Sequence, residues 1–554
     1  MLTIWIYVPL LFAAITNALQ NERQLRHRLT NRFGHTAHQK RALSGALTVE
    51  LNIDHFGSGQ GTFKNRYWIN DTYYDGGPVF VYDVGESNAE PYYGFVLQEA
   101  DGIQSSIMAL TKKYKGLGIL WEHRYYGEST PFQDQFPSVA NFTVKEWQYL
   151  TLDQALEDFS VFAKNFTLPS GSQIKLKSAD ALRPQNTPWI VVGASYPGVR
   201  AALLRIRSPE VVFASWSSSG PVQSQINMAS YYEAIERALP RNCSADWVAV
   251  TKYVDDVLMG NNATEQLAVK RALYFAALSG PGGNTTLVEP LSDASIMSIA
   301  SDSIVEVLTF PVVNFQSYGL QTTLPFCDCV ETLNFTSSPT SQGLLATRGI
   351  NATFNAFVVA IAEINKASLF GGDQDTSASY SWSWQYCSQF GYYQVADSNN
   401  PVNIEPTYYT IPEQQACYGG WNMTPSNVFF SNGEYDPWRT LSVNSQESNS
   451  PQRNGSETVP SCNISPQFPS FFGTTYLQQV HGADMFLNSE YPQDQQDAYA
   501  KGLSLFSSAL DRWLPCHNAT SSTSGARSTG SHRSSGWLLC TSILCASFLL
   551  FFLN

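Results

Sequence analysis

Basic residues are scarce in this chain of 554 residues, which has 33 Lys and Arg against 46 Asp and Glu and a formal net charge of −13 at pH 7. A protein of this charge repels nucleic acids and anionic membranes, so we expect neither as a partner. Cysteine and histidine are also few, with nine and eight residues. Cys327 and Cys329 have no further Cys or His at zinc-ligand spacing, so we exclude a metal site there and expect no metal or other cofactor.

The beginning of the chain has the composition of a targeting region. Residues 1–18 are an apolar run that ends in small residues, which is typical of a secretory signal peptide. The run is short and contains a proline, which disfavours the alternative of a membrane anchor. Residues 19–41 are basic and end in the pair Lys40-Arg41, so they predict a pro-segment rather than a nucleic-acid-binding arm. Removal of this segment leaves the mature protein still more acidic.

The end of the chain has the arrangement of a lipid-attachment signal. A Ser/Thr/Gly-rich linker, residues 516–536, holds a small-residue triplet that starts at Ser524, and an apolar tail follows at residues 537–554. This order predicts a glycosylphosphatidylinositol (GPI) anchor at Ser524. A membrane-spanning tail is the alternative, but the run is short for a bilayer. We therefore expect a secreted or cell-surface protein that meets the membrane only through a lipid anchor.

Sequons for N-glycosylation are more numerous than chance would give, which also favours secretion. They lie at Asn70, Asn141, Asn165, Asn242, Asn262, Asn284, Asn334, Asn351, Asn422, Asn454, Asn463 and Asn518. An oxidising compartment implies disulfides. The expected mature chain keeps an odd number of cysteines, and their spacing leaves the pairing open.

One stretch predicts the chemistry. An apolar run at residues 189–192 ends in Gly-Ala-Ser and passes directly into a helical pattern at 199–206, which indicates a strand, a sharp turn at Ser195 and a helix. Such a nucleophile elbow exposes the serine hydroxyl above the sheet edge, and the N–H of Tyr196 can bind an oxyanion. Pro197 replaces the usual second glycine, and proline suits the first turn of a helix. The alternative is an incidental serine on an ordinary turn.

Strand and helix patterns alternate around this elbow. Buried strands are expected at residues 78–84, 118–122, 211–216, 427–430 and 474–480. Helical patterns replace this alternation at residues 228–418. We therefore expect a parallel sheet covered by helices, residues 42–227 and 419–515, with a mostly helical cap inserted at 228–418.

The chain order Ser, Asp or Glu, His selects the general base. After Ser195 only three histidines remain, and His532 lies in the expected tail while His517 lies beyond the closing helix. His481 directly follows strand residues, so a loop at the carboxyl edge of the sheet would bring it to Ser195. We therefore expect His481 to be the base.

The acid and the second oxyanion donor are expected on loops that follow strands. Asp436 lies after the strand at 427–430 and is preferred over its neighbour Glu434, although an ordinary Asn-Gly turn would also explain that loop. Gly85 and Glu86 follow an early strand, and glycine lets a backbone approach closely, so their N–H groups are candidate oxyanion donors.

Several longer motifs carry a resemblance to a known family. They are Asp54-His-Phe56, Thr62-Phe-Lys-Asn-Arg-Tyr-Trp68, Glu122-His-Arg-Tyr-Tyr-Gly127, Tyr149-Leu-Thr-Leu-Asp-Gln-Ala155, Gly193-Ala-Ser-Tyr-Pro-Gly198, Ser218-Ser-Gly-Pro-Val222, Gln385-Tyr-Cys-Ser-Gln-Phe-Gly391 and Asn432-Gly-Glu-Tyr-Asp-Pro-Trp438. Over about residues 50 to 515 the chain resembles the prolyl carboxypeptidase-like serine peptidases, and most of all their fungal acid prolyl endopeptidases.

The resemblance implies an α/β-hydrolase core with a helical cap that cleaves peptides after proline. The family's triad falls on Ser195, Asp436 and His481, while His123 is expected to be structural. The chain departs from the family at Gln389, where a glutamate is usual, and at Gly482, where a second histidine is common.

Substrate and pH expectations follow from this resemblance. A proline pocket needs aromatic walls, and Trp438 and Trp384 are candidates. We expect proline-rich peptides or proteins as substrates and acidic working conditions, in which burial would have to lower the pKa of His481. An esterase or lipase on the same fold, or a non-catalytic surface protein, are the alternatives.

Overall fold

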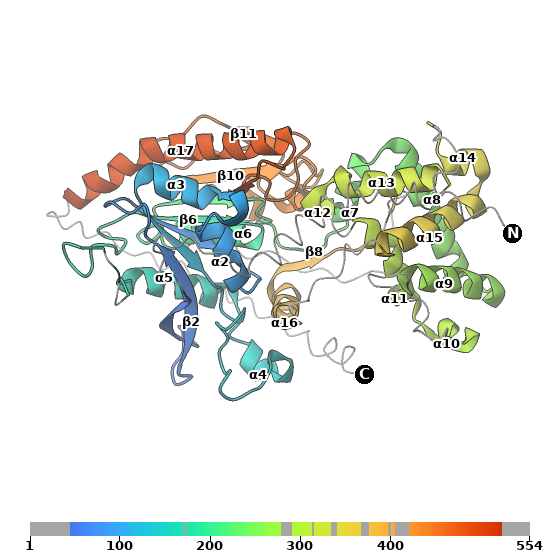
Figure 1. The fold of residues 1–554 in the computed structure, drawn as a ribbon, viewed down its shortest axis with the longest axis horizontal. Helices are drawn as coiled ribbons and strands as arrows, with labels where there is room; N and C mark the ends of the chain where they lie inside the picture. The colour runs from blue at the N-terminus through green and yellow to red at the C-terminus, as the bar shows by residue number, and fades with distance from the viewer. Residues whose placement is uncertain are drawn as a thin grey trace.

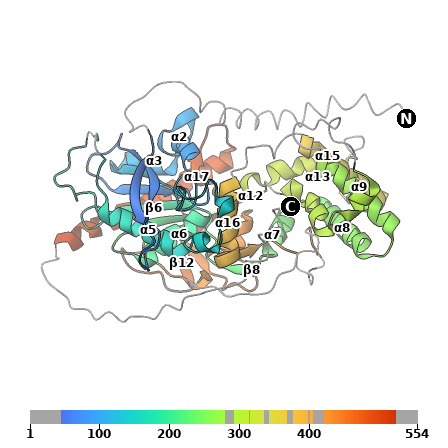
Figure 2. The ribbon, with the colours of Figure 1, turned by 90° about the horizontal axis from the view of Figure 1, so that it is seen from below.

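The computed structural model describes residues 45–522, apart from residues 170–171, 173, 279–290, 313–314, 334–340, 367–375, 397–399, 401 and 405–419. The expected signal peptide, pro-segment, GPI site and apolar tail lie outside the described residues. The described chain forms an α/β core and a helical cap, which lie side by side in two perpendicular views (Figures 1 and 2). Within the described ranges, every helix is too short or too polar to span a bilayer.

The core is built on a nine-stranded sheet in the order β1-β2-β5-β3-β6-β7-β10-β12-β11. β2 is antiparallel to both of its neighbours, and all other pairs are parallel. The strands are β1 (Leu47–Asn52), β2 (Thr62–Asn70), β3 (Val79–Asp83), β5 (Leu117–Trp121), β6 (Trp189–Ala194), β7 (Ala214–Ser218), β10 (Val428–Gly433), β11 (Asn454–Ser456) and β12 (Ser470–Tyr476). Residues that follow the parallel strands meet at one edge, where ligands of such sheets bind.

Helices cover both faces of the sheet (Figure 1). They are α2 (Glu90–Leu97), α3 (Ser106–Tyr114), α5 (Leu152–Asn165), α6 (Tyr196–Arg207) and α17 (Gln493–Ser522). Val79 and Val81 of β3 pack in one apolar cluster with Phe159 of α5. Phe80, between them, packs in a second cluster with Phe506 of α17. Alternate strand residues point to opposite faces, so a strand covered on both sides is apolar throughout.

Short elements complete the core. They are η1 (Ala100–Gly102), β4 (Gln104–Ser105), η2 (Val139–Asn141), α4 (Val144–Trp147), η5 (Gly420–Asn422), η6 (Pro437–Leu441) and β13 (Phe486–Leu487), which pairs with β4.

The cap is helical and is inserted between β7 and β10. Its elements are β8 (Gln225–Asn227), α7 (Ser230–Ala238), α8 (Arg241–Met259), α9 (Ala263–Leu278), α10 (Asp293–Ser298), α11 (Ser301–Val305), η3 (Glu306–Val312), α12 (Phe315–Tyr318), α13 (Leu320–Glu331), α14 (Leu344–Arg348), α15 (Ile350–Lys366), α16 (Thr376–Gln385), the π-turn η4 (Tyr386–Phe390) and β9 (Gly391–Tyr393). Its interior holds the rings of Trp247, Phe326 and Phe357 at centroid distances of 4.7–5.1 Å. A disulfide joins Cys243 to Cys327.

The architecture is that of an α/β-hydrolase with a helical cap, as the sequence predicts. The parallel strands from β5 to β12 lie between two helical layers, and β6 leads through a sharp turn into α6. The strand pattern of the large sheet is interrupted in the cap, because β8 and β9 pair with each other and not with the large sheet.

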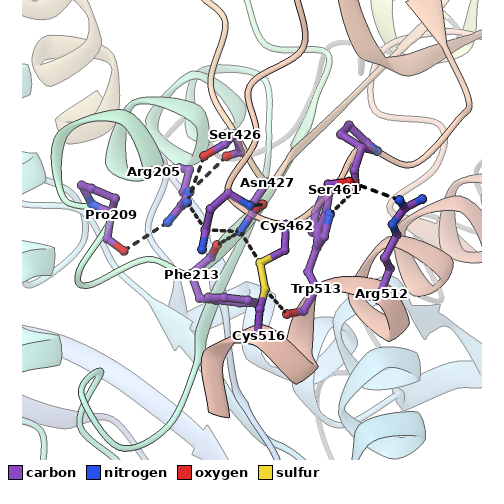
Figure 3. The surroundings of a disulfide bond; sticks show 12 residues. Arg205, Pro209, Phe213, Ser426, Asn427, Ser461, Cys462, Arg512, Trp513 and Cys516 are labelled. Carbon is purple, nitrogen blue, oxygen red and sulfur yellow. Dashed lines mark hydrogen bonds between the residues drawn. A yellow bond between two sulfur atoms is a disulfide. The ribbon is translucent and has the colours of Figure 1, made fainter. Parts of the chain in front are cut away.

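A second disulfide, Cys462–Cys516, fastens the last helix to the core (Figure 3). Arg205 of α6 lies close to it and is buried, and its guanidinium donates to the carbonyl oxygens of Ser426 and Val212 and to Oδ1 of Asn463. No carboxylate is among these acceptors, and burial lowers the pKa of Arg205 to about 10. This network braces the start of β10 against α6, the helix that directly follows the candidate nucleophile.

The sequon asparagines differ in exposure. Those exposed in the described chain are Asn141, Asn165, Asn262, Asn351, Asn422, Asn454 and Asn463. Asn242 is half-buried, and Asn284 and Asn334 lie outside the described residues, as does the side chain of Asn518. Asn70 corrects our expectation, because it is 6% exposed and its amide donates to the carbonyl of Leu97. The fold has no room for a glycan on Asn70.

Candidate active site

Ser195 lies on a strained turn between β6 and α6. Its backbone has φ 67° and ψ −134°, a region that non-glycine residues rarely adopt. Its N–H donates to the carbonyl of Ser218 at 3.0 Å, which ties the turn to β7. The facing loop admits Pro197 only because Gly85 has φ +73° and no side chain, since a Cβ there would lie 2.2 Å from Pro197 Cγ. The glycine missing from the elbow is therefore compensated by one across from it.

His481 and Asp436 are in direct contact at the same edge of the sheet. His481 Nδ1 lies 2.9 Å from Asp436 Oδ1. Asp436 is 1% exposed, and its two oxygens also accept from the N–H of Trp438 and from Nδ2 of Asn432. A carboxylate can only accept, so the proton is on Nδ1 and the lone pair on Nε2. Glu434 instead accepts from the N–H of Gln478 at 2.8 Å and does not contact His481.

The loop after β12 that carries His481 and Gly482, here called the histidine loop, lies beside the elbow. Gly482 donates its N–H to Ser219 Oγ at 2.9 Å, and a Cβ built on it would lie 3.6 Å from the Cβ of Ala194. Within the described residues the hydroxyl of Ser195 makes no hydrogen bond. Contacts between nucleophile and base are often long in free enzymes and shorten when substrate binds. The structure thus brings Ser195, His481 and Asp436 to one edge.

The pKa of His481 differs from our expectation. Burial lowers this pKa, but the charge and the hydrogen bond of Asp436 outweigh burial and raise it above the ordinary value. The expected lowering is therefore wrong, because the histidine is paired with a carboxylate in the same buried space.

Asp484 fastens the histidine loop to three strands. Its carboxylate accepts from Ser218 Oγ at 2.6 Å, Ser431 Oγ at 2.5 Å and the hydroxyl of Tyr476 at 3.0 Å, which belong to β7, β10 and β12. Our sequence analysis missed this role. An acidic residue three positions after the candidate base was the available signal.

The candidate oxyanion donors are not equivalent. Tyr196 is the first residue of α6, where N–H groups have no intrahelical acceptor. The N–H of Gly85 donates to Asp83 Oδ1 at 3.1 Å, and Asp83 is held by the buried guanidinium of Arg200. Gly85 is therefore occupied, which corrects our expectation for this residue and leaves Glu86 on that loop.

Glu86 has an unusual carboxyl group. The residue is half-buried, but its Oε2 is fully buried and has no hydrogen-bond partner among the described residues. Burial raises the pKa of Glu86 to about 7, and its charge acts on His481 and on Tyr196. A carboxyl group with this pKa is protonated below neutral pH and can then donate a hydrogen bond.

Glu122, which begins the motif Glu122–Gly127, holds the loop that follows Glu86. Its carboxylate accepts from Arg66 at 2.7 and 2.8 Å, from the N–H of Ala89 at 2.9 Å and from Ser129. Gly127 ends the motif at φ +55°, where a Cβ would lie 2.2 Å from Glu122 Oε1. The motif is therefore a support for the loop and not part of the reacting groups.

His123 contacts the elbow through the hydroxyl of Tyr196, as expected of a structural residue. Its Nδ1 lies 2.6 Å from the carbonyl of Arg124, so Nδ1 carries the proton and Nε2 accepts from the hydroxyl of Tyr196 at 3.0 Å. That hydroxyl accepts from Nε2 of Gln385 at 2.9 Å, and Tyr126 donates to Gln385 Oε1. Burial holds the pKa of His123 well below its ordinary value. A cap residue, Gln385, thereby reaches the elbow.

The two aromatic candidates, Trp438 and Trp384, pack against different residues. Trp438 lies with its ring centroid 6.4 Å from that of His481 and packs edge-on against Tyr231 and Tyr392. Trp384 instead stacks on Trp147 at a centroid distance of 6.0 Å and packs against a separate apolar cluster, so its role in the substrate pocket stays a prediction.

Trp382, two positions earlier in α16, has its ring centroid 5.7 Å from that of Tyr196. Residues two positions apart on a helix point in different directions, which is why Trp382 packs against Tyr196 while Trp384 packs against Trp147.

Gln389, where the resembling family has glutamate, has a structural contact. Its Oε1 accepts from the N–H of Leu152 at the start of α5, 2.7 Å away. A carboxylate oxygen would accept the same bond, so the exchange leaves this contact intact.

Comparisons with known proteins agree with this arrangement. Residues 51–417 match the family described as serine carboxypeptidase S28. A serine protease, vicPb, of Bipolaris victoriae is 26% identical over 73% of this chain and 79% of its own length. A probable extracellular serine carboxypeptidase of Arthroderma benhamiae is 26% identical over 72% of this chain and 59% of its own. The mouse lysosomal Pro-X carboxypeptidase is 24% identical over 71% and 78%.

Ser195 lies inside the matched range, whereas Asp436 and His481 lie beyond it, so their pairing rests on the geometry above. The match covers more than half of the sequence. The chain therefore belongs to the serine carboxypeptidase S28 family and is a serine-type peptidase.

Proposed function

We propose that this protein is a secreted peptidase that cleaves peptide bonds after proline with Ser195, His481 and Asp436. The observation that carries the proposal is the contact of His481 Nδ1 with buried Asp436, on a loop beside the strained elbow of Ser195. Proline specificity is supported by the name of the Pro-X carboxypeptidase among the relatives.

In this mechanism Ser195 Oγ attacks the carbonyl carbon of the scissile bond while His481 Nε2 takes its proton. Asp436 holds the imidazole in the required tautomer and stabilises the imidazolium. The imidazolium then protonates the leaving amine, which departs and leaves an acyl-enzyme on Ser195. Water attacks the acyl-enzyme with His481 again as the base, and the carboxylic acid product leaves.

The oxyanion of the tetrahedral intermediate requires donors. The N–H of Tyr196 supplies one, and we assign the other to Glu86 in its protonated form, since the N–H of Gly85 is occupied. An ionised Glu86 would repel the oxyanion. Activity therefore requires a proton on Glu86, whose pKa is about 7, which favours acidic to neutral conditions.

The aromatic group of Trp438, Tyr231 and Tyr392 is the candidate wall for the proline ring. Trp438 packs near His481. Aromatic faces bind a pyrrolidine ring through apolar contact, which requires no hydrogen bond. The family description and two relatives carry the word carboxypeptidase, while the resemblance favours endopeptidases. The openness of the cap toward long chains decides between the two.

The expected signals belong to this proposal. We propose a signal peptide at 1–18, a pro-segment at 19–41, glycans on the exposed sequons and a GPI anchor at Ser524. An extracellular relative supports secretion. Release of the protein from cells by phosphatidylinositol-specific phospholipase tests the anchor, and release only by detergent would contradict it.

A digest of one long, proline-containing protein tests the reaction. Internal cuts after proline indicate an endopeptidase, and loss of single residues from the carboxyl end indicates a carboxypeptidase. Cuts without regard to proline, or hydrolysis of acyl esters alone, would contradict the proposal. Ser195→Ala enzyme is the control for contaminating peptidases.

A further inference from the structure

One cap residue, Gln316, contacts Trp438 and His481 in the candidate active site. It belongs to α12, a helix of four residues. Both views place α12 at the junction of cap and core, whereas α9 lies at the far side of the cap (Figures 1 and 2). No sequence motif marks Gln316.

The side chain of Gln316 holds two aromatic residues. Its Oε1 accepts from Trp438 Nε1 at 2.8 Å and from the hydroxyl of Tyr231 at 2.9 Å. Trp438 is 9% exposed and Tyr231 is 4% exposed, so both donors are largely withdrawn from water. An amide oxygen has two lone pairs, and these two bonds use both. One atom thereby fixes the directions of both rings.

The backbone of Gln316 reaches the histidine loop. Its carbonyl oxygen accepts from the N–H of His481 at 2.9 Å. Carbonyls in the last turn of a helix lack intrahelical donors, and the short α12 leaves this one available. Gly319, which follows the helix at φ +57°, lies so close to Val480 that a Cβ would be 2.7 Å from Val480 Cγ1. The cap is therefore seated directly on the loop that carries His481.

Trp438 is held from both sides by these contacts. Its backbone N–H donates to Asp436 Oδ1 at 2.9 Å, and its indole N–H donates to Gln316. The ring position thus depends on the candidate triad and on the cap together. A change at Gln316 therefore removes the contact that fixes the N–H edge of this ring.

We propose that Gln316 is a positioning residue that sets the preference for proline by fixing Trp438 and Tyr231 as the wall of the substrate site. The inference rests on the function proposed above. Without the amide oxygen, the buried N–H of Trp438 and the buried hydroxyl of Tyr231 lose their acceptor. Each ring then lowers its free energy by turning its donor toward another acceptor or water. A proline ring would then lose its fixed aromatic contact.

The test compares two peptides that differ only in proline or alanine before the scissile bond. Gln316→Leu keeps the size of the side chain but removes the acceptor. We expect kcat/KM on the proline peptide to fall about 10- to 100-fold, mainly through a higher KM, because unpaired buried donors carry such a cost. The alanine peptide should lose less, so the proline-to-alanine ratio falls.

Three further variants complete the test. Gln316→Glu keeps an acceptor oxygen and should retain the ratio of the wild type, which a merely structural account of the amide would not require. Tyr231→Phe removes one donor and should give an intermediate ratio. Gln266→Leu is the matched control, since Gln266 lies in α9 and bonds to the carbonyls of Leu258 and Gly260. It should stay within about twofold of the wild type.

The outcomes separate the two proposals. An equal loss on both peptides, or an unchanged ratio in Gln316→Leu, overturns the positioning role. If Gln316→Leu does not fold, Gln316→Glu and Tyr231→Phe decide, and an unchanged ratio in Tyr231→Phe counts against it. A wild-type ratio near one refutes proline specificity and with it the effect of Gln316 on that preference, and leaves the positioning of the two rings to be tested. A double-mutant cycle of Gln316→Leu with Tyr231→Phe on the cleaved peptide then decides, because independent, additive losses contradict the shared bond.

Discussion

The Nδ1 atom of His481 lies 2.9 Å from Oδ1 of Asp436, and the backbone N–H of the same histidine is bonded to Gln316 of the cap. The base is thus oriented by a core residue through its ring and by a cap residue through its backbone. These two contacts underlie the expectations that follow.

Ser195→Ala and His481→Ala should each abolish turnover while leaving the fold intact. Nucleophile and base act as one unit, and removal of either from a related triad lowers kcat about 10⁶-fold. Active-site labelling with a fluorophosphonate and peptide hydrolysis measure the loss. His517→Ala is the matched control, because His517 lies in α17 and contacts the carbonyl of Pro184 and the ring of Phe213. An active His481→Ala enzyme would refute the assignment.

Asp436→Asn should lower kcat about 10⁴-fold, because an amide in place of the carboxylate favours the wrong tautomer of His481. Glu434→Gln should remain active, since Glu434 bonds to the backbone of Gln478. Steady-state kinetics on one peptide compare the two. Greater loss in Glu434→Gln than in Asp436→Asn would reverse the choice of the acid.

The pH profile of kcat/KM should have two limbs. The pKa of His481 is raised, so its neutral form is lost as pH falls through a value above the ordinary one. The pKa of Glu86 is about 7, so its protonated form is lost as pH rises through that region. The two groups interact, and the observed limbs belong to the pair. We expect a narrow maximum close to neutral pH.

Glu86→Gln tests this assignment, because glutamine donates a hydrogen bond at every pH. The alkaline limb should move upward while the acid limb remains. A limb that stays in place would show that Glu86 is not the group responsible. Glu90→Gln is the control, since Glu90 is an exposed carboxylate whose partner is Arg66.

The cap should lose stability as pH rises. Asp246 accepts the N–H groups of Leu344 and Leu345, and the carboxyl of Glu331 lies against it. Burial, together with the charge of Asp246, raises the pKa of Glu331 from 4.5 to about 7. The folded state binds this proton more tightly than the unfolded chain does, so the stabilisation is complete below about pH 4.5 and is lost as pH rises through about 7.

Thermal unfolding at about pH 5 and about pH 8, below and above the pKa of Glu331, measures this effect. The unfolding temperature of the wild type should fall between the two, and Glu331→Gln should reduce the fall. Glu265→Gln, on the exposed start of α9, should behave as the wild type. An equal fall in wild type and Glu331→Gln would contradict the role of the carboxyl pair.

Local sequence determined the elbow and the fold class. A β-branched run that ends in Gly-Ala-Ser before a helical pattern allows few backbone paths, and Ser195 takes the strained one. The alternation of strands and helices fixed the parallel sheet for a similar reason, since each segment must bury its apolar side chains on two faces. Few histidines follow Ser195, so chain order left three candidates and their positions along the chain singled out His481.

Contacts between distant segments decided the rest, because they depend on packing that no local pattern encodes. Trp384 and Trp382 are both aromatic and lie two positions apart, yet only the direction of α16 places Trp382 toward Tyr196. The N–H of Gly85 is occupied because Arg200 holds Asp83 in place. Gln316 meets Trp438 across 122 positions of sequence, and only the seating of the cap on the core brings them together.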